Sequence, residues 1–235
     1  VILSCVYFFL KPIGSMDDLA IAYVDITIPN ERGVMLTLAD GEKVVVGNEK
    51  REVIFEKTGN VNIKQEGRNE LVYENVKISE KRNVEEEAMN EITVPAGERV
   101  SIILSDGTKV WLNSESAIRY PVRFGIGKRV GTVKGNVYFE VTKDVSRPFF
   151  VVMKDMETEV LGTSFEVNTY GDHGEIYMAL VEGCVRVRSG NHVVVAKPNE
   201  QVALDLESRK ISTKEVDAAR LVAWKDGILT NFYPD

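Results

Sequence analysis

Apolar and polar residues alternate with a period of two along most of this chain, whereas the spacing typical of helices is scarce. Between residues 94 and 206 the alternating runs are short, and turns rich in Gly, Asn and Asp separate them at intervals of about 8–12 residues. Successive side chains of a strand point to opposite faces of a sheet, so each run offers one apolar face for burial. The pattern is typical of β-sandwiches and β-barrels, and it predicts one all-β unit over residues 94–206.

An Asp-Gly pair gives the clearest local signal. Asp106-Gly107 separates two alternating runs, which is typical of a β-hairpin. The phrase at 38–44 (Leu-Ala-Asp-Gly-Glu-Lys-Val) matches the one at 104–110 (Leu-Ser-Asp-Gly-Thr-Lys-Val). The repeat is one hairpin long, so it does not indicate a solenoid. We expect residues 17–90 to form similar hairpins, either in the same sandwich or in a second sheet beside it.

The first ten residues are almost uniformly apolar and are followed by Lys11-Pro12. A helix that spans the bilayer takes about 20 apolar residues, so this stretch alone is too short to cross a membrane. Its bulk and aromatic content favour residues 1–12 as the end of a transmembrane helix or its remnant. A buried strand or the core of a signal peptide is the alternative.

The pattern changes after Leu206. Residues 214–226 predict a short helix, because Gly227 follows them as a helix terminator. Residues 228–232 then begin a strand, which cannot be stable alone. We therefore expect residues 207–235 to hold a linker helix and the first strand of a truncated C-terminal α+β domain.

The net charge of −7 comes from 29 basic and 36 acidic residues that are spread along the chain. Since no basic stripe is present in the sequence, binding to nucleic acid is not expected. His173 and His192 lie in turn-rich segments and belong to no spaced set of four ligands, so no metal site is predicted. The cysteines, Cys5 and Cys184, show no pairing pattern. Cys184 shares the parity of Arg186 and is expected to face the surface.

The sequence contains no motif that supports catalysis. Ser114 and Ser116 lack a Gly-x-Ser-x-Gly frame, and residues 125–128 lack the strand-to-helix context of a phosphate-binding loop. The acidic residues are interpreted as a salt-bridged surface rather than as a glycosidase pair. We therefore expect no enzymatic activity and no cofactor. Trp111 and Tyr138 are interpreted as core aromatic residues, with a sugar-binding groove as the alternative.

Six phrases, in order, resemble the FecR domain of bacterial anti-sigma regulators. They lie at 94–99 (Val-Pro-Ala-Gly-Glu-Arg), 104–113, 135–141, 147–151, 160–167 and 180–185. The matching motif residues, which we interpret as structural, are Asp106, Gly107, Trp111, Leu112, Asn113, Gly135, Phe139, Arg147, Pro148, Phe149, Gly162, Thr163, Phe165 and Gly183. Asn136, Glu166 and Cys184 depart from the family pattern, but none of these positions is expected to carry chemistry.

The flanking regions resemble Bacteroidetes-type members of the same family. The phrase at 36–41 is similar to the region that precedes their FecR domain. Residues 224–229 (Trp-Lys-Asp-Gly-Ile-Leu), together with Phe232, are similar to the start of their C-terminal domain. On this resemblance, Trp224, Gly227 and Phe232 are expected to face a partner.

The resemblance implies a jelly-roll-like β-sandwich, the FecR domain, preceded by a β-rich N-terminal extension. It further implies a single-pass inner-membrane anti-sigma factor. The periplasmic part, represented by this chain, would receive a signal from the N-terminal domain of an outer-membrane TonB-dependent transducer. A cytoplasmic region outside this sequence would bind an ECF-type sigma factor. The alternatives are an envelope carbohydrate-binding module and a purely structural envelope protein.

Overall fold

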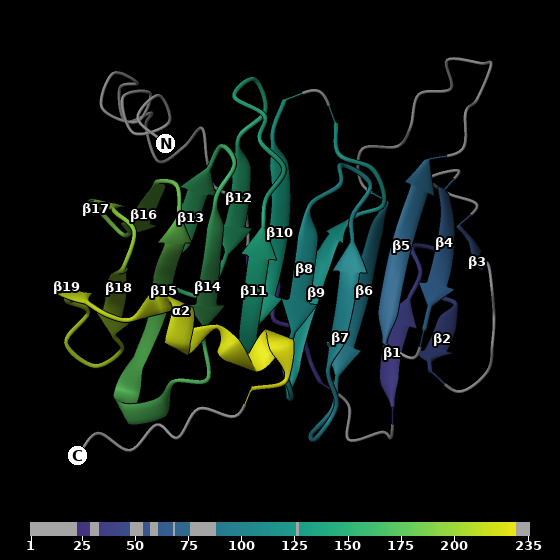
Figure 1. Cartoon of the computed structure of the whole chain (residues 1–235), viewed down its shortest axis with the longest axis horizontal. Helices are drawn as coiled ribbons and strands as arrows, with labels where there is room; N and C mark the ends of the chain where they lie inside the picture. The colour runs from purple at the N-terminus through teal and green to yellow at the C-terminus, as the bar shows by residue number, and fades with distance from the viewer. Residues whose placement is uncertain are drawn as a thin grey trace.

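Two β-sheets pack face to face in the protein (Figure 1). The computed structural model describes residues 23–28, 33–47, 54–56, 61–67, 69–75, 88–125 and 127–228. The prediction of an all-β sandwich is confirmed over these residues. The membrane segment expected at 1–12 and Phe232 lie outside them.

In chain order the elements are β1 (Val34–Thr37), β2 (Lys43–Val46), β3 (Ile54–Glu56), β4 (Val61–Glu66), β5 (Glu70–Asn75), β6 (Met89–Val94), β7 (Val100–Ile103), β8 (Lys109–Leu112), β9 (Ser116–Pro121), β10 (Arg129–Lys134), β11 (Asn136–Glu140), β12 (Phe149–Val152), β13 (Glu157–Val160), β14 (Ser164–Asn168), η2 (Asp172–Gly174), β15 (Glu175–Glu182), β16 (Val185–Ser189), β17 (His192–Ala196), β18 (Glu200–Asp205), β19 (Ile211–Glu215), α2 (Ala218–Leu221) and η3 (Ala223–Asp226). Among the described residues, one sheet has nine strands in the order β17-β16-β13-β12-β10-β9-β6-β1-β2. The other has ten, in the order β19-β18-β15-β14-β11-β8-β7-β5-β4-β3. Neighbouring strands are antiparallel except for β5 with β7 and β10 with β12, which are parallel.

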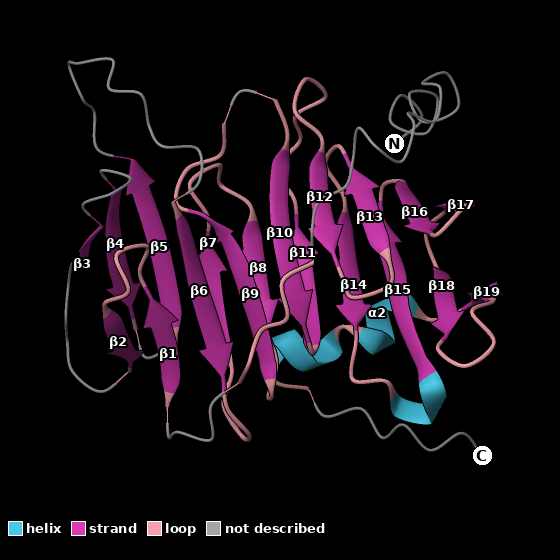
Figure 2. Ribbon diagram, turned by 180° about the vertical axis from the view of Figure 1, so that it is seen from behind, coloured by secondary structure: helices cyan, strands magenta, loops and turns pink. Residues whose placement is uncertain are grey.

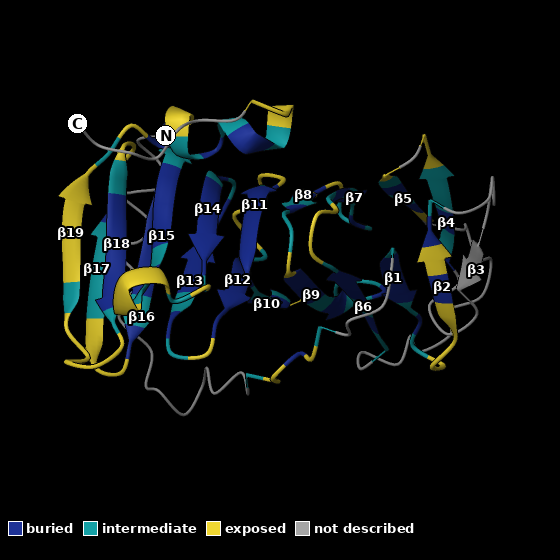
Figure 3. Cartoon of the chain, turned by 90° about the horizontal axis from the view of Figure 1, so that it is seen from below, coloured by how far each residue is buried: buried dark blue, intermediate teal, exposed yellow. Residues whose placement is uncertain are grey.

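The alternation in the sequence determines which side chains fill the space between the sheets. Val137 and Phe139 of β11 are fully buried there, and Phe139 stacks on Phe165 of β14 with 5.2 Å between ring centroids. Phe149 of the opposite sheet lies 6.1 Å from Phe139 between ring centroids. Burial of each such side chain contributes roughly 1.5–3 kcal/mol. Figure 3 shows that buried residues fill the central strands, whereas exposed residues gather at edge strands such as β19.

The early strands extend both sheets of the same sandwich. β1 pairs with β6 in the nine-stranded sheet, and β5 pairs with β7 in the ten-stranded sheet. The hydroxyl of Tyr73 on β5 lies 2.7 Å from that of Tyr120 on β9, and the Asn90 amide of β6 donates to the Tyr73 hydroxyl at 2.6 Å. Of the two arrangements that the sequence leaves open, the structure therefore has the early hairpins in the same sandwich.

The two Asp-Gly hairpins share one turn geometry. In each, the glycine N–H donates to the carbonyl of the preceding leucine, Leu38 or Leu104, at 2.9 Å. The leucine N–H in turn donates across the turn at 2.8 Å, and the φ angles of Gly41 and Gly107 are 88° and 83°. The sequence repeat is thus a repeat of local structure, with one copy in each sheet.

After β19 the chain crosses the outer face of the ten-stranded sheet as α2 and the 3-10 helix η3 (Figures 1 and 2). The prediction of a helix from residue 214 is wrong at its start, because residues 211–215 pair with β18 at the edge of the sheet. The Asp217 carboxylate caps α2 by accepting the Arg220 N–H at 3.1 Å. Gly227 ends η3 with a φ of 78°, as the sequence predicts.

Candidate interaction site

A buried ion pair lies beneath the Asp106-Gly107 turn. Arg129 is fully buried, and its Nη1 donates to Asp106 Oδ2 at 2.7 Å and to the Thr142 carbonyl at 2.9 Å. Its Nε donates to the Arg147 carbonyl at 2.9 Å. Asp106 therefore does more than shape a turn, since it neutralises a cation inside the fold. Sequence reasoning missed Arg129, because nothing in its local pattern distinguishes it from a surface arginine.

The Arg147-Pro148-Phe149 motif surrounds the same cation. The Pro148 carbonyl accepts the Arg129 N–H at 2.9 Å, and the Arg129 guanidinium lies 5.3 Å from the centroid of the Phe149 ring. Arg147 Nε donates to Asp144 Oδ2 at 2.8 Å. Hydrogen bonds from Ser146 and Arg147 hold the pKa of the Asp144 carboxyl well below its usual range. The motif thus packs and orients Arg129.

Two motif glycines lie where the chain passes from one sheet to the other. Gly135 joins β10 to β11 with a φ of 88°, and a Cβ at this position would lie 2.6 Å from the Ser116 Cα. Gly162 lies between β13 and β14 with a φ of 149°, and a Cβ there would lie 2.6 Å from the Lys143 Cα. Approaches this close leave no room for a side chain. Gly183 lies at a third crossing, between β15 and β16.

The remaining motif residues divide between the core and the surface. Leu112 and Phe165 are fully buried between the sheets, while Gly107 is exposed. Asn113 Oδ1 accepts a hydrogen bond from Arg99 Nε at 3.1 Å. The Thr163 hydroxyl donates to the Cys184 carbonyl at 3.1 Å.

The outer face of the ten-stranded sheet binds the segment that follows β19. Trp224 of η3 is 7% exposed and packs with Val222 and with Tyr138 of β11. The indole N–H of Trp224 donates to Glu166 Oε1 on β14 at 2.9 Å. We call residues 217–228 the arm. We call the sheet residues that it contacts the docking seat: Trp111, Tyr138, Glu166 and Val181.

Two basic side chains complete this contact. Arg99 Nη1 donates to the Trp224 carbonyl at 3.0 Å, and the Arg99 guanidinium lies 5.9 Å from the indole centroid. Lys225 Nζ lies 5.5 Å from the Trp111 ring centroid and 5.4 Å from that of Tyr138. A cation over an aromatic face contributes about 0.5–1 kcal/mol at exposed sites and more when water is excluded. The arm is thus held by a buried indole, a buried acceptor and cation–π contacts.

Glu166 is the buried acid of the docking seat. It is 1% exposed, and burial raises the pKa of its carboxyl to about 7, while hydrogen bonds from Trp224 and Asn136 act in the opposite direction. In the described part of the chain, Glu166 Oε2 and Asn136 Oδ1 are buried acceptors without a hydrogen-bond partner. Near pH 7 the carboxyl is therefore present in both protonation states.

The docking seat differs from what the sequence led us to expect. Trp111 and Tyr138 lie on the outer face and not in the core, because the neighbours that alternate with them point inward. Glu166, for which we expected no role, binds the arm. Glu166 lies between two residues of a central strand whose side chains point into the core, so its own side chain lies on the outer face. An acid at such a position is the signal that could have indicated that this face is covered. Trp224, expected to face a partner, contacts the docking seat in this structure, and contact of Trp224 and Gly227 with a partner stays a prediction.

Cys184 is fully buried against Leu161 and Val195, so the expectation that it faces the surface is wrong. It lies in the crossing between β15 and β16, where the parity of a strand does not apply.

Within the described ranges, no three His, Cys, Asp or Glu side chains come together in a way that could hold a metal ion. The helices described are all too short or too polar to cross a membrane.

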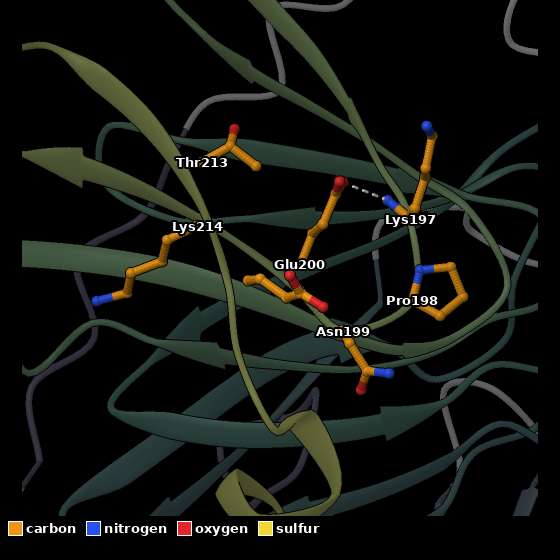
Figure 4. A pocket seen from close by; sticks show the side chains of 7 residues that line it. Lys197, Pro198, Asn199, Glu200, Thr213 and Lys214 are labelled. Atoms are coloured by element: carbon orange, nitrogen blue, oxygen red, sulfur yellow. Dashed lines mark hydrogen bonds between the residues drawn. The ribbon is translucent and has the colours of Figure 1, made fainter. Parts of the chain in front are cut away.

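Two hollows lie where the edge strands β17 and β19 end the two sheets. One is lined by Lys197, Pro198, Asn199, Glu200, Thr213, Lys214 and Glu215 (Figure 4). Within it, Glu200 Oε2 accepts the Lys197 N–H at 2.8 Å. The lysines and glutamates of this lining balance in charge, so the hollow selects neither an anionic nor a cationic ligand.

Comparison with known proteins agrees with this architecture. Residues 90–186 match the family described as FecR protein. Two crystal structures of candidate anti-sigma factors from Parabacteroides distasonis are similar to the chain. One is 33% identical with a TM-score of 0.57, and the match covers 59% of this chain and 65% of that chain. The other is 34% identical with a TM-score of 0.56 and covers 58% and 65%. No curated protein matches the sequence.

The fold and the docking seat define a two-sheet sandwich with an element of its own chain bound on one outer face. Within this sandwich, residues 90–186 are the part that matches the FecR protein family. The chain spans 65% of the length of the two chains from Parabacteroides distasonis, slightly less than two thirds.

Proposed function

We propose that this chain is the periplasmic part of a membrane-anchored anti-sigma factor. It receives a signal from the N-terminal domain of an outer-membrane TonB-dependent transducer and passes it to a cytoplasmic ECF-type sigma factor. A single helix anchors the protein in the inner membrane. The observation that carries the proposal is the match of residues 90–186 to the FecR family, together with the similarity of the chain to two candidate anti-sigma factors at 33% and 34% identity.

A relay of this kind needs a body that keeps its shape and an element whose position depends on the partner. The sandwich can serve as the body that keeps its shape, because the buried Arg129–Asp106 pair and the aromatic core stabilise it. The arm can serve as the element whose position depends on the partner, since it connects β19 to the residues that follow Ile228.

The docking seat does not favour the carbohydrate-binding alternative. A sugar would have to stack on the exposed face of Trp111 or Tyr138. Tyr138 is 3% exposed, and Lys225 lies over both rings. The aromatic surface is therefore covered by the chain itself.

The direct test is the affinity between the transducer's N-terminal domain and the protein from residue 17 to its own C-terminus, measured by isothermal titration calorimetry. We expect saturable binding with a Kd in the micromolar range or tighter, about −8 kcal/mol or more favourable. The N-terminal domain of an unrelated transducer serves as the control and is expected to bind at least tenfold more weakly.

A truncation after Glu215 sharpens the test, because it keeps β19 in the sheet and removes the arm with everything beyond it. We expect this variant to lose binding while its far-UV circular dichroism and Tm show a folded sandwich. Unchanged affinity would place the contact on the sandwich instead. No binding by the longer, folded protein would contradict the proposed function.

A further inference from the structure

We propose that the arm, residues 217–228, is detachable, and that the transducer binds preferentially to the state in which Trp224 has left the docking seat. The identity of the partner in this proposal rests on the proposed function. The existence of two arm states does not, since it follows from the contacts below.

The docked arm makes a small contact. Its buried side chains are those of Ala218, Val222 and Trp224. α2 has a single turn, and a helix this short is not stable in isolation, so its form depends on docking. β19, by contrast, pairs with β18 along its whole length. The border between the fixed and the detachable part of the chain therefore falls at Asp217.

The docked state also leaves polar groups unsatisfied. Within the described residues, Glu166 Oε2 and Asn136 Oδ1 are buried acceptors that receive no hydrogen bond. The indole contacts the Glu166 carboxyl, so its departure would open that group to water, and desolvation of the carboxyl opposes docking. Burial of the Trp224 ring favours docking, and the two contributions act in opposite directions. Opposing contributions of this kind produce two states that a modest difference in binding energy can exchange.

The geometry connects the arm directly to whatever binds beyond it. Ile228 lies four residues after Trp224 and is 56% exposed, and its N–H donates to the Ala223 carbonyl at 3.2 Å. A partner that binds the chain after Ile228 would therefore pull directly on η3. Undocking would also free Arg99 from the Trp224 carbonyl.

The first experiment needs no partner. The chain contains two tryptophans, so labelling with 5-fluorotryptophan gives two ¹⁹F resonances, which Trp224→Phe assigns. In a urea titration we expect the Trp224 resonance to move to its solvent-exposed position before the circular dichroism of the sandwich is lost. Glu166→Ala should move this first transition to lower urea. Glu182→Ala, which removes an exposed acid of β15, should leave it unchanged. Coincident loss of both signals overturns the proposal of a detachable arm.

The second experiment adds the transducer's N-terminal domain to the labelled protein. We expect the Trp224 resonance to move toward the solvent-exposed position as the complex saturates, and Glu166→Ala to bind several-fold more tightly. Binding with an unmoved Trp224 resonance and unchanged affinity overturns the coupling but leaves the proposed function intact. Absence of binding contradicts the proposed function, while the urea titration still decides whether the arm detaches.

Discussion

Arg129 and Glu166 are both buried and chargeable, yet they hold their surroundings in different ways. Arg129 has a counter-ion, Asp106, at 2.7 Å, and it also donates to the carbonyls of Thr142 and Arg147. Glu166 forms no ion pair among the described residues, and its Oε1 accepts from the neutral indole of Trp224. A buried charge with its counter-ion belongs to the permanent fold, whereas a buried acid without one titrates near neutral pH. Pairing, more than burial, therefore separates the rigid sandwich from the detachable arm.

The largest expected effect on stability comes from removing one partner of the buried Arg129–Asp106 ion pair. Arg129→Met leaves Asp106 buried without its counter-ion, and we expect it to lower the free energy of unfolding by about 3–5 kcal/mol. Urea denaturation followed by circular dichroism measures this change. Glu74→Ala is the matched control, because the Lys64–Glu74 pair is 38% and 46% exposed. It should cost less than about 1 kcal/mol. Equal effects of the two variants would show that burial of the pair is unimportant.

The second effect concerns the arm. A tryptophan in a permanent core costs about 3–5 kcal/mol when changed to alanine. Trp224→Ala should cost the sandwich only about 1–2 kcal/mol, because the loss cannot exceed the free energy of docking. Ile228→Ala, at an exposed position of the same arm, is the control and should change stability by less than about 0.5 kcal/mol. A loss of 3 kcal/mol or more for Trp224→Ala would make the arm part of the core.

The third effect is a pH dependence of docking. The pKa of Glu166 is about 7 when the arm is docked, against 4.5 for an ordinary glutamate, so docking retains a proton between these values. Docking is therefore strongest below about pH 4.5, weakens as the pH rises to about 7, and is constant above that. The two pKa values allow docking to weaken by at most about 3 kcal/mol across this window, and the ¹⁹F resonance of Trp224 measures the change.

The two tyrosines near Glu166, Tyr138 and Tyr177, do not titrate in that window. Burial raises the pKa of Tyr138 to about 12 and that of Tyr177 still further, so both stay neutral. Lys225 and Asp226 of the arm pair with each other at 2.9 Å. Glu166→Gln keeps an acceptor for the indole but cannot ionise, and its docking should be independent of pH. A pH dependence that persists in Glu166→Gln would assign the effect to another group.

The smallest effect is that of Asp40→Ala, in the first of two hairpins that share a backbone geometry but differ in pairing. Asp40 is exposed and its Oδ1 accepts the Glu42 N–H at 2.9 Å, whereas Asp106 also neutralises Arg129. Asp40→Ala should cost about 0.5–1 kcal/mol, and Asp106→Ala at least 2 kcal/mol more. Thermal unfolding of the two variants side by side provides the measurement. Equal losses would mean that the turn itself, and not the ion pair, makes Asp106 matter.

The sequence predicts the sandwich well because alternation is a local signal. Val137 and Phe139 point inward as the period of two requires, and the Asp-Gly pair specifies both hairpins. Arg129 could not be recognised, since its counter-ion lies 23 residues away in sequence. Glu166 and Trp224 are 58 residues apart, and their contact exists only because the arm folds back over the sheet. Periodicity shows which face a residue occupies, but not what covers that face.

Hydrogen exchange measured by mass spectrometry tests the central claim, a detachable arm on a rigid sandwich, most directly. The amides of Lys225, Gly227 and Ile228 donate only within the arm, so they should exchange through local opening. The amides of β11 and β14 should exchange only through global unfolding, at least about a hundredfold more slowly. This difference, widened by Glu166→Ala, is the predicted result. Equal protection of the arm and of β14 would contradict the account.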